Sequence, residues 1–173
     1  MNRMPMKPIF RAFRHLWLDA GDARRAVTPA GLQRLEEAVR RSEIHHRGEL
    51  RLCIEAGLSV PLLWRGITPR QRAVEVFSRL QVWDTEQNNG VLIYLLLADR
   101  RIEIVADRGL ARHVGAAQWL ALTDALATHL KAGAFEQGLT GAVQEIDMLL
   151  RQHFPAQDGR ANPNELPDSV VIL

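Results

Sequence analysis

Six polar residues with ligating or charged side chains stand near the ends of the predicted strands of this chain. They are Glu49, Asp84, Asn88, Asn89, Asp107 and Arg108. Carboxylate and amide oxygens are the ligands that a hard cation such as Ca²⁺ or Mg²⁺ prefers, whereas carboxylates combined with the nearby His45 and His46 suit Zn²⁺ or Mn²⁺. The guanidinium of Arg108 suits a phosphate or another anion. The sequence therefore predicts a site for a divalent cation, with an anion-binding arginine beside it.

Several of these residues also have an ordinary structural explanation. Asn89-Gly90 is a common turn sequence, Asp107-Arg108 suits a surface ion pair, and His45-His46 suits a fraying helix end. The sequence contains no P-loop, GxSxG, HExxH or EF-hand pattern. The residues therefore indicate a site without specifying a reaction.

Three predicted strands, 49–56, 91–98 and 102–106, decide which polar residues meet. A helix joins the first strand to the second, so these two are parallel and related by a right-handed crossover. The short turn at Asp99-Arg100-Arg101 makes the second and third strands antiparallel. The start of the second strand then lies beside the end of the third and at the same edge as the start of the first. This topology gathers the six polar residues at one rim of the sheet, and the turn at Asp99 is interpreted as a mere connection at the opposite edge.

Helical periodicity predicts helices over the first twenty residues, after Thr28-Pro29, from Thr68-Pro69 to Trp83, and over 114–130 and 135–154. The second predicted strand is apolar on both faces, so helices should cover both sides of the sheet. The expected fold is α/β, a three-layer α/β/α sandwich with a mixed sheet of mainly three to five strands. Residues 57–68 are expected to be a loop that closes over apolar surface. We divide the chain into an N-terminal extension (1–27), a central domain (28–154) and a proline-rich tail (155–173).

The predicted first helix is basic and amphipathic, and Gly21 is expected to end it. Its apolar face includes Phe10, Phe13 and Trp17, which are candidate partner-binding or membrane-binding residues. One interpretation places this helix on an anionic membrane surface. The alternative, which we favour because Phe and Trp on such a face are usually buried, docks it on its own domain or on a second copy. The last four residues of the tail are apolar, and we expect them to dock as an edge strand.

Composition excludes several classes of protein. A net charge of +2 over 173 residues is too small to indicate a nucleic-acid-binding protein. The single Cys53 excludes an internal disulfide framework or a cysteine-based zinc site, and its place in a strand favours a buried thiol. No apolar run approaches the roughly 18 residues of a membrane-spanning helix, and no secretory signal is recognisable. We therefore expect a soluble, cytoplasmic protein, with contact to a membrane limited to its periphery.

The run NNGVLIYLLLADRRIEIVADRGL resembles the TPM domain, named for thylakoid lumen, photosystem II repair and acetylcholine-receptor modulator proteins. The resemblance extends from Thr28 to Phe154 and includes the helix start at Thr28-Pro29, the strand at Gly48-Glu49-Leu50-Arg51 and a glycine-containing helix near 138–141. It implies an α/β/α sandwich, Ca²⁺ binding at the sheet rim, weak acid-phosphatase activity and auxiliary roles beside membrane complexes. The rim candidates carried over from the family are Asp84, Asn88, Asn89, Asp107, Arg108 and, less directly, Glu49. Many relatives have a signal peptide and membrane anchor, so this chain resembles a soluble short variant.

Three functions follow as hypotheses. The first is a non-enzymatic accessory domain that binds Ca²⁺ or another divalent cation and a protein partner near a membrane. The second is a weak metal-dependent acid phosphatase in which Arg108 holds the phosphate. The third is a peripheral membrane adaptor that acts through the first helix. A homodimer is a further expectation, and no nucleic-acid partner is expected.

Overall fold

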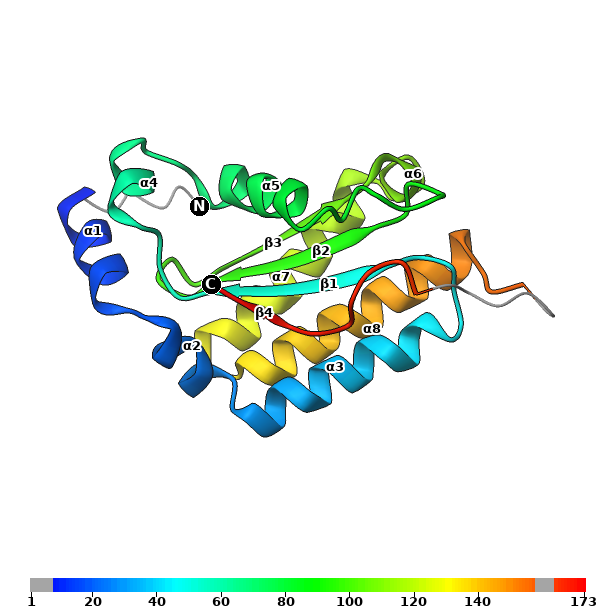
Figure 1. Cartoon of the computed structure of the whole chain (residues 1–173), viewed down its shortest axis with the longest axis horizontal. Coiled ribbons are helices and arrows are strands. Elements are labelled where there is room, and N and C mark those ends of the chain that lie inside the picture. Colours follow the sequence, from blue (N-terminus) through cyan, green and yellow to red (C-terminus); the bar gives the residue numbers. More distant parts are fainter. Residues whose placement is uncertain (1–7, 158–163) are drawn as a thin grey trace.

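The computed structural model describes residues 8–157 and 164–173, and Figure 1 shows their arrangement. In chain order the elements are α1 (Pro8–Trp17), α2 (Ala20–Ala26), α3 (Pro29–Glu43), β1 (Leu50–Glu55), α4 (Val60–Trp64), α5 (Pro69–Arg79), β2 (Val91–Leu96), β3 (Arg101–Ala106), α6 (Arg108–Ala111), α7 (Ala116–Lys131), α8 (Phe135–His153) and β4 (Val171–Ile172). Among these described elements, no helix is both long enough and apolar enough to cross a membrane.

The strands form one mixed sheet in the order β3-β2-β1-β4. β1 pairs with β2 in parallel, with Leu50 opposite Val91, and β2 pairs with β3 in antiparallel, with Val91 opposite Ala106. Both pairings confirm the predicted topology. The starts of β1 and β2 and the end of β3 therefore lie at the same end of the sheet, which we call the rim.

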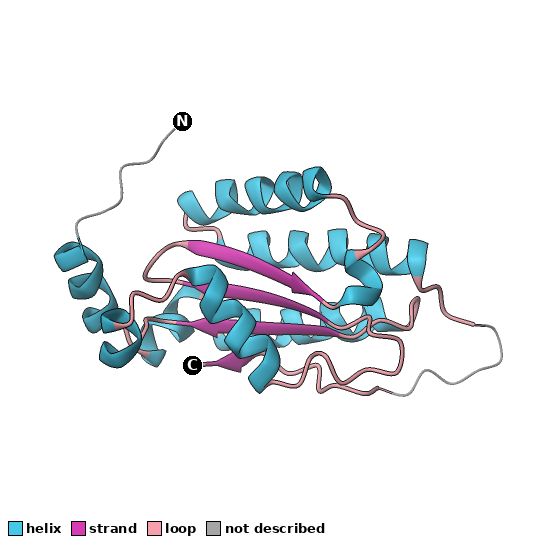
Figure 2. Ribbon diagram, turned by 90° about the horizontal axis from the view of Figure 1, so that it is seen from above, coloured by secondary structure: helices cyan, strands magenta, loops and turns pink. Residues whose placement is uncertain are grey.

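Helices cover both faces of this sheet, as the apolar β2 requires. In Figure 1, α5 lies above the strands, α3 and α8 lie below them and α7 runs behind them, and Figure 2 shows α5 crossing over the strands from above. One core cluster joins Leu52, Ile93 and Ile104 to α3, α7 and α8, and a second joins Leu92 and Tyr94 to α5. The three-layer α/β/α sandwich is thus confirmed.

The two Thr-Pro sequences begin helices where the sequence predicts. The Thr28 side chain accepts a hydrogen bond from the Gly31 N–H at the start of α3, and Thr68 accepts one from the Gln71 N–H at the start of α5. Each proline occupies the first helical position, where its missing N–H has no helical partner to lose. These caps fix where both helices begin.

The expected single helix over the first twenty residues is wrong, because two helices form. Asp19 caps α2 by accepting a hydrogen bond from the Asp22 N–H, and Asp22 reciprocates through its side chain. This capping box separates α1 from α2 and places Gly21 inside α2 rather than at a helix end. Residues 1–7 of the predicted helix lie outside the described residues.

Both faces of β1 are buried, although its alternating sequence predicts one polar face. Glu55 on that face accepts two hydrogen bonds from the Arg72 guanidinium of α5, each 2.9 Å long, and a third of 2.5 Å from the Tyr94 hydroxyl. A buried carboxylate needs such partners to offset the loss of water. Alternation in β1 therefore separates two buried environments, one apolar and one with paired charges. Cys53 on the same face is fully buried, as predicted, and burial raises the pKa of its thiol to about 12.

The C-terminal residues dock on the sheet as β4, which confirms the prediction of an edge strand. Cys53 lies opposite Val171 in a parallel pairing, and Leu166 is buried in the core on the α5 side. The Glu36 carboxylate also accepts a hydrogen bond of 3.0 Å from the Val170 N–H. The tail thus closes the exposed edge of β1.

Candidate functional site

Backbone hydrogen bonds bring the predicted rim segments together. The Asp107 N–H donates to the Gly90 carbonyl over 2.9 Å, and the Val91 N–H donates to the Glu49 carbonyl over 2.8 Å. The Gly109 N–H donates to the Asn88 carbonyl, and a Cβ at position 109 would lie 2.3 Å from that same oxygen. Gly109 is therefore required where the loop before β2 lies against α6.

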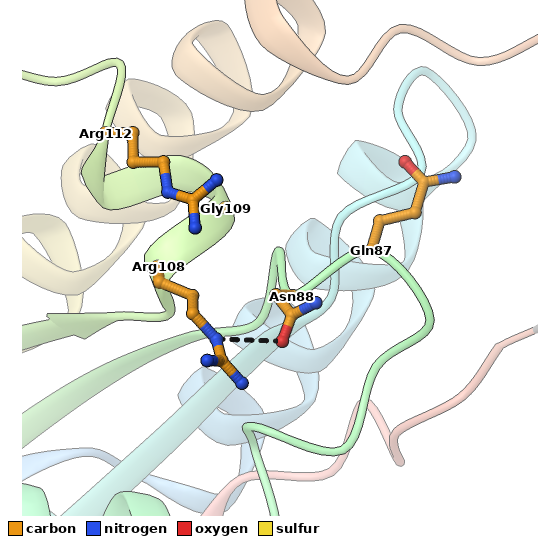
Figure 3. A pocket seen from close by; sticks show the side chains of 5 residues that line it. All are labelled: Gln87, Asn88, Arg108, Gly109 and Arg112. Atoms are coloured by element: carbon orange, nitrogen blue, oxygen red, sulfur yellow. Dashed lines mark hydrogen bonds between the residues drawn. The ribbon is translucent and has the colours of Figure 1, made fainter.

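A pocket of about 300 Å³ opens on this rim between the loop and α6. It is lined by Gln87, Asn88, Arg108, Gly109 and Arg112 (Figure 3). Figure 3 shows the Arg108 side chain reaching from α6 toward Asn88, whose Oδ1 accepts a hydrogen bond of 3.3 Å from Arg108 Nε. The polar atoms of this pocket come from two amide and two guanidinium side chains.

The two arginines give the pocket a positive charge. Arg108 and Arg112 are both exposed, and within residues 8–157 and 164–173 no carboxylate forms an ion pair with either of them. Arg108 begins α6 and Arg112 is its C-cap residue in the helical conformation, so their spacing of four residues places them on the same side of this turn. Guanidinium groups bind phosphate and carboxylate through two or more charge-assisted hydrogen bonds. The local charge at the pocket therefore favours an anion.

The predicted carboxylate ligands lie at the rim but serve different contacts. Glu49 is fully buried, and its Oε2 accepts a hydrogen bond of 3.0 Å from the Leu166 N–H of the tail. Asp107 caps α6, since its Oδ1 accepts a hydrogen bond of 2.7 Å from the Arg108 N–H. Asp84 is exposed in the loop before β2. Burial raises the pKa of Glu49 to about 7, so this carboxyl lies in surroundings that disfavour its charged form.

Asn89 is buried beneath the loop and holds it in place. Its side-chain amide donates a hydrogen bond of 2.7 Å to the Arg47 carbonyl, and its backbone N–H donates to Thr85 Oγ1 over 3.1 Å. Asn88 has a positive φ of 53°, a conformation that asparagine tolerates better than most residues. Both asparagines therefore shape the loop, and Asn88 also lines the pocket.

Within the described residues, the rim contains unpaired oxygen atoms of the kind that bind a divalent cation, but its acidic side chains are not clustered around one point. Three oxygens, Glu49 Oε1, Asn89 Oδ1 and Asp107 Oδ2, are buried without a hydrogen-bond partner in the described part of the chain. These are oxygens of the kind that Ca²⁺ binds. Among the same described residues, however, no three His, Cys, Asp or Glu side chains are grouped so that they could hold a metal ion. The cation site stays a prediction.

The two histidines considered as zinc ligands have separate surroundings. His46 is fully buried, and burial lowers its pKa to about 4. Its Nε2 lies 3.6 Å from Asp147 Oδ1 of α8, whereas His45 is exposed. His46 therefore contacts the helical layer on the α8 side.

The opposite end of the sheet contains a group of polar contacts around Asp99. The sequence analysis interpreted this turn as a mere connection. Asp99, in the turn between β2 and β3, accepts hydrogen bonds from Arg11 Nη2 over 2.9 Å and from His15 Nε2 over 3.1 Å. His15 is buried, and its Nδ1 accepts a hydrogen bond of 2.8 Å from the Leu58 N–H. Burial raises the pKa of Asp99, but the hydrogen bonds from His15 and Arg11 outweigh that effect and lower it to about 2. Asp99 is thus the residue on which α1 docks.

This docking reverses the expected orientation of α1. The helix lies on its own domain, as favoured, but through its polar face. Phe13 and Trp17 are 61% and 74% exposed, and the side chain of Phe10 lies outside the described residues. The loop expected over residues 57–68 contains α4, whose Trp64 is 87% exposed, so its apolar residues do not all close over the core. Docking through the polar face gives the partly buried Asp99 carboxylate hydrogen bonds from Arg11 and His15 that offset its loss of water.

Sequence reasoning missed two pocket residues and one exposed aromatic. Arg112 could have been found from its spacing of four residues from Arg108, but only if the four-residue helix α6 had been recognised. Gln87 precedes the predicted Asn88-Asn89 pair and carries no stronger signal. Nothing in the local sequence distinguishes the exposed Trp64 from a buried tryptophan.

Comparisons with known proteins agree with this fold. Residues 22–149 match the profile of the TPM domain. The structure is similar to the NMR structure of the BA42 protein from the psychrophilic bacterium Bizionia argentinensis, with a TM-score of 0.73 and 28% sequence identity. That similarity covers 84% of this chain and 94% of the BA42 chain. No curated protein sequence matches the chain significantly.

Proposed function

The chain belongs to the TPM domain family, and on that premise we propose that it is an accessory binding domain whose rim pocket takes an anionic group of the phosphate type. One observation carries this proposal: Arg108 and Arg112 line the same pocket and form no ion pair with any described carboxylate. The expected protein partner near a membrane would supply that group as a phosphorylated or acidic ligand.

The composition of the pocket supports binding rather than catalysis. Its lining residues are glutamine, asparagine, glycine and two arginines, which provide hydrogen-bond donors and positive charge. None of the five has a carboxylate, imidazole, hydroxyl or thiol group that could act as a nucleophile or general base. The weak acid-phosphatase alternative would need such a group from outside the pocket lining.

The test is a titration of the isotope-labelled protein with inorganic phosphate, followed by NMR. We expect concentration-dependent shifts of the Gly109 and Arg112 amide signals, since both residues line the pocket. Arg108→Gln and Arg112→Gln should each weaken binding by about tenfold, because a hydrogen bond to a charged group contributes roughly 1.5–3 kcal/mol and 1.4 kcal/mol is a tenfold change. Arg24→Gln is the matched control, since it removes one exposed positive charge from α2.

Equal binding by wild type and by both pocket variants would overturn the proposal, as would the absence of any shift at the pocket. Release of phosphate from a generic phosphomonoester, lost in Arg108→Gln and retained in Arg24→Gln, would favour the phosphatase alternative instead.

A divalent cation at the rim is a second candidate, favoured by the three buried, unpartnered oxygens of Glu49, Asn89 and Asp107. These residues would hold the ion, and its charge would offset the cost of burying the Glu49 carboxylate. Calorimetric titration with Ca²⁺, Mg²⁺ and Zn²⁺ tests it. Asp107→Asn keeps an oxygen that can cap α6 but removes the charge. We therefore expect the wild type to bind the cation and this variant not to bind it. No heat of binding with wild type would exclude the candidate.

A further inference from the structure

Helix α1 is docked by its polar face and leaves its apolar face in solvent. Arg11 and His15 contact Asp99, and His15 is 3% exposed. Phe13, Leu16 and Trp17 on the other face are 61%, 60% and 74% exposed. The Phe13 and Trp17 rings stack on each other with their centroids 5.7 Å apart. The aromatic pair thus faces solvent, while the opposite face of α1 is docked on the domain.

The neighbouring α4 also exposes apolar side chains. Figure 1 shows α1 and α4 together at the end of the sheet opposite the rim, and the two helices are in contact. Val60 and Trp64 of α4 are 45% and 87% exposed. We call Phe13, Leu16, Trp17, Val60 and Trp64 the aromatic surface. A Trp or Phe side chain presents roughly 150–250 Å², so its three aromatic rings alone expose several hundred Å², which is as large as the main apolar patch of a typical monomer.

Positive charge accompanies the aromatic surface. Residues 8–17 of α1 include Arg11 and Arg14 and no acidic residue. Arg100 and Arg101 follow Asp99 directly and are exposed, so they lie at the same end of the sheet as the docked α1. The acidic Asp99 itself is turned inward and engaged by Arg11 and His15. Arg11 is paired with Asp99, so the exposed positive charge at this end that complements an anionic surface is that of Arg100 and Arg101.

This combination of exposed aromatic and basic side chains is more typical of a surface that binds lipid headgroups than of one that binds a protein. Tryptophan has an apolar ring and a polar N–H, and it prefers the boundary between lipid tails and headgroups. Arginine keeps its charged end in the headgroup region while its stem contacts apolar surface. Amphipathic helices that combine aromatic and basic residues bind membranes more strongly when the lipids are anionic.

We propose that the aromatic surface formed by α1 and α4 docks on the surface of an anionic lipid bilayer, with Trp17 and Trp64 entering the headgroup boundary. The rim pocket, at the other end of the sheet, would then face away from the bilayer and remain open to its ligand. The proposal depends on neither the phosphate nor the cation candidate, because no rim residue belongs to the aromatic surface.

The test is sedimentation of the full chain with vesicles of phosphatidylcholine alone and with vesicles that also contain phosphatidylglycerol. We expect pelleting with the anionic vesicles, weakened by salt, and a blue shift of tryptophan emission on binding. Trp17→Ser combined with Trp64→Ser should lower the partition coefficient by about tenfold or more, since both rings lose their insertion. Trp83→Ser is the matched control, because Trp83 is 48% exposed in the loop that leads to the rim. Circular dichroism verifies that each variant is folded.

Three results would overturn the proposal. The first is the absence of pelleting by wild type, and the second is equal pelleting of the double variant and wild type. The third is a dimer in light scattering without vesicles that the double variant converts to monomer, which would assign the aromatic surface to a second copy of the chain.

Discussion

A carboxylate lies at each end of the sheet, Glu49 buried at the rim and Asp99 partly buried at the opposite end, and the two have opposite electrostatic surroundings. Asp99 accepts hydrogen bonds from Arg11 and His15, and its pKa is lowered to about 2. Glu49 at the rim accepts backbone hydrogen bonds, and burial raises its pKa to about 7. The acid that the sequence analysis favoured as a ligand has no cationic side chain beside it in the described structure, whereas the acid interpreted as part of a connection contacts the Arg11 guanidinium and the His15 imidazole.

The difference shows that position in the fold, rather than residue type, decides what a carboxylate does. At the α1 end, polar side chains from two segments, α1 and the turn between β2 and β3, meet and stabilise one another. At the rim, the arginines of α6 face the pocket and solvent, while Glu49 faces the tail. The following predictions test this contrast, beginning with the largest expected effect.

Glu55→Ala should have the largest effect on stability. Glu55 ends β1 beside the Asp99 turn, is 4% exposed, and accepts two hydrogen bonds from Arg72. Removing one partner of a buried ion pair costs about 3–5 kcal/mol because the other charge stays buried without compensation. Urea unfolding measures the loss. Glu75→Ala is the control, since its exposed contact with Arg72 is worth about 1 kcal/mol or less. An equal loss of unfolding free energy in the two variants would contradict the contrast between buried and exposed pairs.

Asp99→Asn should lower the free energy of unfolding by about 2 kcal/mol at neutral pH, the value of a pKa lowered from 3.8 to about 2. The folded-state pKa is depressed, so this contribution is complete above pH 4 and is lost as the pH falls toward 2. The difference between wild type and variant should therefore shrink over that window in urea unfolding. Proteolysis between α1 and α2 should also become faster in the variant. A pH-independent difference would show that the charge of Asp99 is not what holds α1.

Glu49→Gln should stabilise the protein at pH 8, with the opposite pH dependence. The folded-state pKa of Glu49 is raised from 4.5 to about 7. The stability of the wild type is therefore highest below pH 4.5, where the carboxyl is protonated, and falls as the pH rises through 7. We expect a gain of about 1–2 kcal/mol at pH 8 and none at pH 4, because the new amide N–H groups offset part of the benefit. Stabilisation of wild type but not of the variant by Ca²⁺ at pH 8 would support the cation candidate. A loss of stability at pH 8 would contradict the assignment of Glu49 as a destabilised charge.

Asp84→Ala should have the smallest effect. The side chain is exposed in the loop before β2, and surface substitutions of this kind usually change stability by less than about 0.5 kcal/mol. Thermal unfolding checks this expectation. A larger loss would reveal a contact of Asp84 that matters to the rim and would return it to the group of candidate ligands.

Most of the fold was predictable because it rests on local patterns. The Thr28-Pro29 and Thr68-Pro69 caps, the apolar run of β2 and the short turn after it each specify an element within a few residues. The crossover rule then fixed the strand directions. The split between α1 and α2 was missed because Asp19 and Asp22 act together as a capping box, and Gly21 between them is a stronger apparent breaker.

The candidate site was predicted only in its location. Topology placed Asn88, Asp107 and Arg108 at one rim, and the hydrogen bond between Asn88 and Arg108 confirms that these two meet. The pairing of charges was not predictable, because it depends on contacts between residues far apart in the chain. Arg11 and Asp99 are separated by 88 residues, and Glu49 and Leu166 by 117.

The sequence by itself determined the layers, the strand directions and the end of the sheet at which the rim residues gather, because periodicity and chain connectivity are sufficient for these. Only the tertiary structure decided that Asp99 anchors α1, that Glu49 faces the tail and that Phe13, Trp17 and Trp64 face solvent. The amphipathic pattern of α1 states which residues share a face, but not which face is buried. That choice follows from the energy of the partly buried Asp99 carboxylate, which only the packed structure brings next to Arg11 and His15.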